Sequence, residues 1–214
     1  MFGDERTAPQ SGCESANRKS DGEEGAAVRP PKLQHGVHIQ SMASYIALLR
    51  AVNVGGTGKL LMQDLSAMCE AAGFRCVQTY IASGNVVFES KLGETAIRKE
   101  LERRLLAHAG KPVGVAVRTA AEMAEVLARN PFPTAPGNRS IAIFLDAAPP
   151  DTALESVSGR VDEEVAIGRR EIYVLYGANM ARSKLKIPVA KDGTMRNMNT
   201  VAKLAAMAAE KGHD

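Results

Sequence analysis

Tryptophan is absent from the 214-residue chain, and aromatic residues make up only 4% of it. Bases of single-stranded nucleic acids stack on aromatic side chains, so few such stacking surfaces are available. The sequence also lacks an apolar run of about 18 residues, the length that indicates a transmembrane helix. No apolar stretch of signal-peptide length lies near the N-terminus, so we expect neither a membrane partner nor secretion.

Cysteine is scarce as well, since Cys13, Cys69 and Cys76 form an odd set without paired spacing. This pattern argues against a disulfide framework and suits a reducing compartment, so we expect a cytoplasmic protein whose thiols are small buried groups. Histidine offers a His-x-x-His spacing at His35 and His38 but no zinc-ligand pairs of the usual kind. We therefore expect no metal and no cofactor.

The remaining composition is that of a globular protein, with 45% hydrophobic and 24% charged residues. Residues 1–42 differ, because they are rich in Gly, Ser, Pro, Glu and Arg and have no apolar periodicity. Such a segment buries too little apolar surface to offset its ordering entropy, so we expect a disordered leader or a non-native extension. Met42 is a plausible native start, and residues 1–41 should be dispensable for stability.

Periodicity in residues 43–130 predicts a first α+β half. Leu61, Leu65, Met68 and Ala72 recur at helical spacing, and short apolar runs bounded by turn residues indicate strands. The expected elements are strand 45–50, helix 61–72, strands 77–81 and 86–89, a helix around 97–106 and strand 113–118. Their order is that of the ferredoxin-like β-α-β-β-α-β unit.

Residues 131–214 repeat this order in part, after a helix at 120–128 and a Pro-rich stretch at 130–137. The expected elements are strand 141–145, a short helix at 151–157, hairpin strands 164–167 and 172–176, an optional edge strand at 185–189 and a final helix capped by Asn197 or Asn199. The fold prediction is therefore α+β, with two related ferredoxin-like halves that share a layer of helices.

Charge is distributed unevenly along the chain. Residues 169–211 hold nine Lys or Arg against three Asp or Glu, a net charge of +6, which leaves −3 for the rest of the +3 chain. A basic C-terminal portion points to an anionic partner such as a phosphate-containing ligand or nucleic acid. A solvated basic face is the alternative.

Glycine-rich turns mark the first candidate site. Asn53 opens the segment Asn53–Lys59, which contains Gly55 and Gly56 and joins a strand to a helix directly after Arg50. Backbone amides of such loops can bind phosphate, although the spacing matches neither a Walker loop nor a dinucleotide fingerprint. A tight strand-to-helix turn is the alternative.

Ser83 and Asn85 flank Gly84 between two apolar runs, which predicts a turn with positive φ at Gly84. No histidine can be placed beside Ser83, so a Ser-His-acid triad is not expected. The turn is therefore either part of a ligand site, with Ser83 and Asn85 as its polar groups, or a hairpin connection alone.

Arg182, Lys184, Arg196 and Asn197 form the basic part of the candidate site. Arg196 is expected at a helix N-terminus, where free amides and a guanidinium together suit an anion. We expect this region to meet the Arg50 and Asn53 region in space. The alternatives are an Arg196 in solvent beside a simple cap, or arginines that pair with buried carboxylates and hold the halves together.

Several of these segments, in order, resemble the bacterial domain-of-unknown-function family 1697: residues 50–56, 79–88, 130–132, 173–185 and 193–204. The similarity covers about residues 43–210. The chain departs from the family pattern at Ala51, where Gly is usual, at Ala82, where Gln is usual, and at Met198, where Trp is usual. The resemblance implies an α+β fold and no established activity.

Taken together, the residues favour an α+β protein that binds an anionic ligand, either a nucleotide or nucleic acid. Two alternatives stay open. One is an enzyme that acts on a phosphorylated small molecule held by Gly55 and Gly56, and the other is a protein-interaction module without a small-molecule site.

Overall fold

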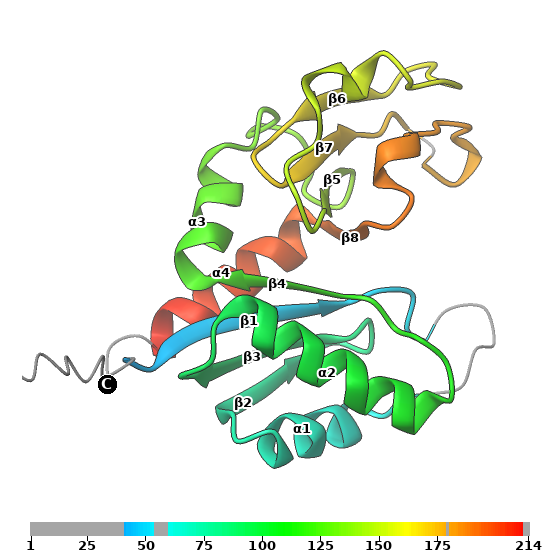
Figure 1. Cartoon of the computed structure of the whole chain (residues 1–214). Helices are drawn as coiled ribbons and strands as arrows, with labels where there is room; N and C mark the ends of the chain where they lie inside the picture. The colour runs from blue at the N-terminus through cyan, green and yellow to red at the C-terminus, as the bar shows by residue number, and fades with distance from the viewer. Residues whose placement is uncertain (1–40, 54–59, 179, 212–214) are drawn as a thin grey trace, which may run out of the picture. The chain divides into compact units, whose positions relative to one another are not determined.

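A computed structural model describes residues 41–53, 60–178 and 180–211 of the chain (Figure 1). Four helices and two four-stranded antiparallel sheets make up this part, so the predicted α+β class is confirmed. Residues 1–40 of the expected leader lie outside the described residues, as do Gly55 and Gly56.

The first sheet is built from residues of the first predicted half, and all six predicted elements are present. These are β1 (Ala43–Leu49), α1 (Met62–Ala71), β2 (Arg75–Tyr80), β3 (Asn85–Ser90), α2 (Glu94–Ala109) and β4 (Val115–Thr119). The strand order is β2-β3-β1-β4, and every neighbouring pair is antiparallel. Helix α3 (Ala120–Ala128) follows at once.

The second sheet has the order β6-β7-β5-β8, again with every neighbouring pair antiparallel. Its strands are β5 (Ser140–Phe144), β6 (Glu164–Ile167), β7 (Glu171–Leu175) and β8 (Thr194–Asn197), and α4 (Met198–Lys211) ends the described chain. Three short 3-10 turns complete it, at η1 (Asp151–Leu154), η2 (Met180–Arg182) and η3 (Pro188–Ala190).

Two predictions for the second half need correction, and one strand was not predicted. Residues 185–189 form no strand but one isolated bridge, between Lys186 and Ser158, followed by the 3-10 turn that Pro188 begins. The expected helix at 151–157 is the single turn η1. Strand β8 was not predicted at all, because four residues with a polar inward face carry no apolar alternation.

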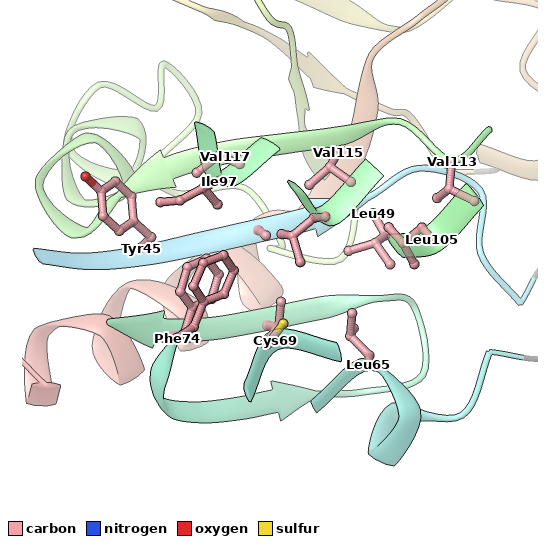
Figure 2. Packing of buried hydrophobic residues seen from close by; sticks show 14 of the residues in the cluster. Tyr45, Leu49, Leu65, Cys69, Phe74, Ile97, Leu105, Val113, Val115 and Val117 are labelled. Atoms are coloured by element: carbon pink, nitrogen blue, oxygen red, sulfur yellow. The ribbon is translucent and has the colours of Figure 1, made fainter. Parts of the chain in front are cut away.

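The hydrophobic core has three parts. One face of the first sheet packs on α1 and α2, where the rings of Phe74 and Phe88 stack with centroids 4.4 Å apart (Figure 2). The other face packs on α3, α4 and the second sheet, and this shared cluster includes Ile46, Phe144 and Leu204. A third cluster covers the far face of β5 and β7.

Burial of the thiols follows this arrangement only in part. Cys69 is fully buried in α1, and burial raises the pKa of its thiol to about 12. The expectation is wrong for Cys76, which is exposed on the edge strand β2. Cys13 lies outside the described residues.

Candidate functional site

The turn after β1 and the turn between β2 and β3 are joined by the Asn53 side chain. Its Nδ2 donates to the carbonyl oxygens of Leu60 and Ala82 at 2.9 and 2.7 Å, and its Oδ1 accepts from the amide of Leu60 at 2.9 Å. The amide of Leu49 donates to the carbonyl of Gly84 at 2.8 Å. Asn53 therefore fixes both turns with its own side chain.

Left-handed backbone conformations concentrate in these two turns. Ala51, Asn53 and Ile81 have φ values of 50°, 57° and 49°, and Gly84 has the predicted positive φ, at 75°. The left-handed conformation is strained for Ala and more so for a β-branched residue such as Ile. Such strain often gathers at functional sites.

Asn85 opens β3 and is completely buried. Its Nδ2 donates to the carbonyl of Tyr80 at 2.9 Å and to Oγ of Ser83 at 3.0 Å, and its Oδ1 accepts from Nε of Arg196. Within the described residues no histidine contacts the Ser83 hydroxyl, whose oxygen accepts from the side-chain amide of Asn85.

Arg196 is 8% exposed and lies on β8, where it reaches across to the first sheet. Burial lowers the pKa of its guanidinium to about 10. No carboxylate in the described part of the chain pairs with it. All three nitrogens donate to uncharged acceptors: Asn85 Oδ1, Thr194 Oγ1 and the carbonyl oxygens of Met195, Leu49, Ser83 and Gly84.

The fold thus brings Ser83, Asn85 and Arg196 into contact. Asn53 is linked to the same turn through its hydrogen bond to the Ala82 carbonyl. Asn197 caps the N-terminus of α4, because its Oδ1 accepts from the amide of Thr200 at 2.9 Å. Arg50 is exposed and pairs with Asp192 at 3.0 Å. Arg196 was expected at a helix N-terminus. It lies instead in strand β8, just before α4, and its guanidinium reaches the turns of the first sheet.

Arg182 and Lys184 lie in a separate basic segment. Lys184 and Lys186 line an open cleft of about 480 Å³ with Ser158 and Gly159. Among the described residues no carboxylate pairs with Arg182, Lys184 or Lys186. The segment is held by Ser183, which donates to Glu163 and accepts from the amide of Leu185 at 3.1 Å. The Ser183 hydrogen bond lowers the pKa of the Glu163 carboxyl.

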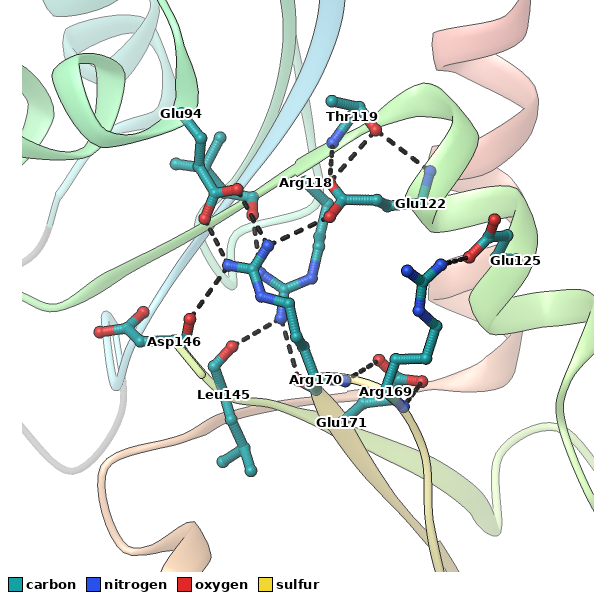
Figure 3. Close-up of polar contacts among 11 residues, drawn as sticks. Glu94, Arg118, Thr119, Glu122, Glu125, Leu145, Asp146, Arg169, Arg170 and Glu171 are labelled. Atoms are coloured by element: carbon teal, nitrogen blue, oxygen red, sulfur yellow. Dashed lines mark hydrogen bonds and ion pairs between the residues drawn. The ribbon is translucent and has the colours of Figure 1, made fainter. Parts of the chain in front are cut away.

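A second polar cluster, which sequence reasoning missed, surrounds Arg118 on β4 (Figure 3). Arg118 is 1% exposed, and its guanidinium donates to the carbonyls of Val117, Leu145 and Arg170 at 2.7, 2.6 and 3.0 Å. Its Cζ lies 5.5 Å from the centroid of the Phe144 ring. The available signal was a charged residue at the end of an apolar strand.

Glutamates around Arg118 are bonded to other groups. Glu94 and Glu122 pair with Arg170, and Glu122 also closes the capping box of α3 with Thr119. Glu171 is buried and accepts from three donors, the amides of Arg169 and Arg170 and the hydroxyl of Tyr173.

The two buried arginines occupy matching places in the two sheets. Arg118 is paired with Ile46, three residues before Leu49, and Arg196 is paired with Ala142, three residues before Leu145. Arg196 donates to the carbonyl of Leu49, and Arg118 donates to the carbonyl of Leu145. Each sheet therefore contributes one arginine that donates to the end of a central strand of the other sheet, β1 or β5.

Comparison with known proteins places the chain. A model of the family described as "Protein of unknown function (DUF1697)" matches residues 42–173. The chain belongs to the DUF1697 family. A solved structure titled as that of conserved bacterial protein SP0830 from Streptococcus pneumoniae is similar in fold, with 24% identity, a TM-score of 0.66, and coverage of 78% of this chain and 99% of that one. No curated protein matches.

Two departures from the DUF1697 pattern have a structural reading. Ala51 stands in a left-handed conformation that glycine adopts without strain, which agrees with the glycine expected there from the family resemblance. Met198 is 6% exposed and packs in the shared cluster, so this position supplies core volume in the DUF1697 protein rather than an open stacking surface.

Within the described residues of the DUF1697 protein, no helix is long and apolar enough to span a bilayer. Likewise, no group of three or more His, Cys, Asp or Glu residues in that part is arranged to hold a metal ion.

Proposed function

We propose that this DUF1697 protein binds an anionic, phosphate-containing ligand, a nucleotide or nucleic acid, through the basic segment that holds Arg182, Lys184 and Lys186. The observation that carries the proposal is the open cleft of about 480 Å³ lined by Lys184 and Lys186. Neither lysine has a carboxylate partner in the described part of the chain. Lysines placed in this way are point charges that suit phosphate groups.

The distribution of charge along the sequence supports anion binding at the same surface. The basic residues of the C-terminal portion outnumber its acids by six, and Lys184 and Arg182 are exposed. Phosphate contacts of this kind supply most of the affinity for nucleic acid and make it salt-dependent. A cytoplasmic location fits a ligand of this class and the free thiols of Cys69 and Cys76.

The turn cluster of Asn53, Ser83, Asn85 and Arg196 has a different role in this proposal. Arg196 donates to acceptors of both sheets and would hold them in register, while Asn53 and Asn85 shape the turns. Phosphate binding by Gly55 and Gly56 stays a prediction, as does a contribution from Arg50 and Asn197.

We also propose that residues 43–130 and 131–214 are two related ferredoxin-like halves. The order β2-β3-β1-β4 has the same arrangement as β6-β7-β5-β8, with the first strand of each half in the centre. The matching positions of Arg118 and Arg196 support this relation, because they recur at the same register of each sheet.

Binding is tested by fluorescence anisotropy with a labelled single-stranded oligonucleotide and by competition with nucleotides and sugar phosphates. The double variant Lys184→Glu/Lys186→Glu should weaken binding by at least about tenfold and reduce the slope of log affinity against log salt by about 2. Lys99→Glu/Lys203→Glu, an equal charge change at exposed helical positions, is the matched control.

Two results would contradict the proposal: equal loss of binding in both double variants, or no saturable binding of any probe by the wild type. If nucleotides compete fully with the oligonucleotide, the ligand is a nucleotide. If only longer oligonucleotides bind, the ligand is nucleic acid.

A further inference from the structure

A pocket separate from the basic segment lies between α3 and the turn that joins β6 to β7. It encloses about 230 Å³, and since a water molecule takes about 30 Å³ of liquid, it has room for a ligand of several heavy atoms. Its charged lining consists of Arg118, Arg129, Arg169, Arg170, Glu122, Glu125 and Glu171. Glu94, outside this lining, pairs with Arg170, so four glutamates stand against the four arginines.

Arg118 is the unusual member of this lining, because it is a buried cation without a counter-ion. It is 1% exposed, and within the described residues no carboxylate lies at ion-pair distance from its guanidinium. Burial, and then the charge of Arg170, lower its pKa, and together they outweigh the charges of Glu122, Glu94 and Glu171, which raise it. A buried charge that is not paired is costly, so an external anion would lower the free energy of this site.

Hydrogen-bonding capacity remains on the same guanidinium. An arginine carries five N–H donors. The three bonds of Arg118 to carbonyl oxygens use Nη1 once and Nη2 twice. In the described part of the chain, Nε–H and the second Nη1–H have no acceptor. Its counterpart Arg196 differs, since it has six acceptors and uses Nε as well.

The neighbouring carboxylates are bonded to groups other than Arg118. Glu125 pairs with Arg169 at 2.5 Å, Glu94 and Glu122 pair with Arg170, and Glu171 accepts from two backbone amides and from the Tyr173 hydroxyl. Arg129 lines the pocket from the end of α3, and no ion pair of Arg129 occurs among the described residues. Arg118, which is buried, and Arg129, which is exposed, thus line the pocket without forming an ion pair among the described residues.

We propose that this pocket binds a small molecule through its carboxylate or phosphate group, with Arg118 and Arg129 as the anion-binding residues. The planar fork of a guanidinium suits either group. Arg170 keeps its two glutamate partners and positions the carbonyl to which Arg118 donates. The site is independent of Lys184 and Lys186, which line a different cleft.

Calorimetric titration of the full chain with inorganic phosphate and with succinate tests this site, at constant ionic strength set by chloride. At least one probe should bind saturably in the millimolar range or tighter. Arg129→Gln should weaken that binding about tenfold, the loss of one charged contact of about 1.4 kcal/mol. Arg75→Gln, the same change at an exposed position on β2, should leave it unaltered.

Absence of saturable binding for both probes would overturn the inference, and so would equal affinities of Arg129→Gln and Arg75→Gln. Binding that Lys184→Glu/Lys186→Glu abolishes would assign the anion to the other cleft and equally overturn it. Preference for phosphate or for succinate distinguishes the two ligand groups. Because Arg118 is buried, Arg118→Lys is compared with wild type only after its melting temperature confirms that it folds.

Discussion

At the scale of single residues, the chain uses arginine where a core would ordinarily exclude charge. Arg118 and Arg196 are buried, and their N–H groups donate mainly to carbonyl oxygens at strand ends. A buried carbonyl left without any donor costs about 1–3 kcal/mol. One guanidinium donates to several carbonyls at once, and some of these, such as those of Gly84 and Arg170, also accept from a backbone amide.

Gly84 combines a left-handed backbone with close packing, so a larger residue there should be costly. It has φ of +75°, and an added Cβ would lie 2.4 Å from Val52 Cγ2 and 2.8 Å from Leu49 Cβ. Gly84→Val should therefore lower the free energy of unfolding by roughly 1–3 kcal/mol or more, measured by urea denaturation.

Gly73→Val is the matched control for this prediction. Gly73 has φ of +81°, but nothing lies within 4 Å of the added Cβ. It carries the backbone strain without the clash, so its loss of stability should be the smaller one. Equal losses in the two variants would mean that packing around Gly84 relaxes freely.

At the scale of elements, α3 shows how local and distant groups act on one carboxylate. Glu122 forms the capping box with Thr119 and also pairs with Arg170 of the β6–β7 turn at 3.1 Å. Burial alone would raise the pKa of Glu122, but the hydrogen bonds from Thr119 and the charge of Arg170 outweigh it, and the pKa is lowered. The start of α3 is thereby tied to the second sheet.

Acid should remove this contribution. A carboxyl whose pKa is lower in the folded state stabilises the protein above its unfolded pKa, near 4.3, and loses that effect as the pH falls below it. Glu122→Gln should be less stable than wild type by about 1 kcal/mol at neutral pH, and the difference should shrink as the pH falls below about 4. Unfolding curves across this range provide the measurement.

Glu125→Gln serves as the comparison on the same helix. Its partner Arg169 is exposed, and exposed pairs contribute little. A pH dependence equal to that of Glu122→Gln would contradict the role assigned to the capping carboxylate.

At the scale of the whole described molecule, the shared cluster links the two sheets. It contains Ile46 and Val87 of the first sheet, Phe144 and Tyr173 of the second, and the inner faces of α3 and α4. Neither sheet buries this surface without the other, so residues 41–53, 60–178 and 180–211 should unfold as one cooperative unit.

Native-state hydrogen exchange tests that expectation. The amides of β1 and β5 should open with the same free energy. Phe144→Ala should lower both values together by about 3–5 kcal/mol, because Phe144 is 1% exposed in the cluster that both sheets share. Loss of protection confined to β5 would show that the sheets open separately.

Local patterns in the sequence were enough to predict the class of fold and most of the helices and strands. Apolar periodicity located all four helices, because amphipathic spacing is a local property that each helix needs in order to bury one face. It also located the turn at Gly84, whose positive φ is a local requirement. The family could also be predicted from the sequence, because its motifs occur in the same order along this chain.

The positions of the charged groups could be read only from the folded structure. Strand β8 has four residues, and its inward face holds Thr194 and Arg196, so no local pattern marks it as a strand. Four of the six acceptors of Arg196 lie more than 100 positions earlier in the chain. Two of the three acceptors of Arg118 belong to the second half, and they come close to Arg118 only in the folded protein. Hydrogen bonds between distant segments leave no periodic signal, because their partners are chosen by packing rather than by spacing along the chain.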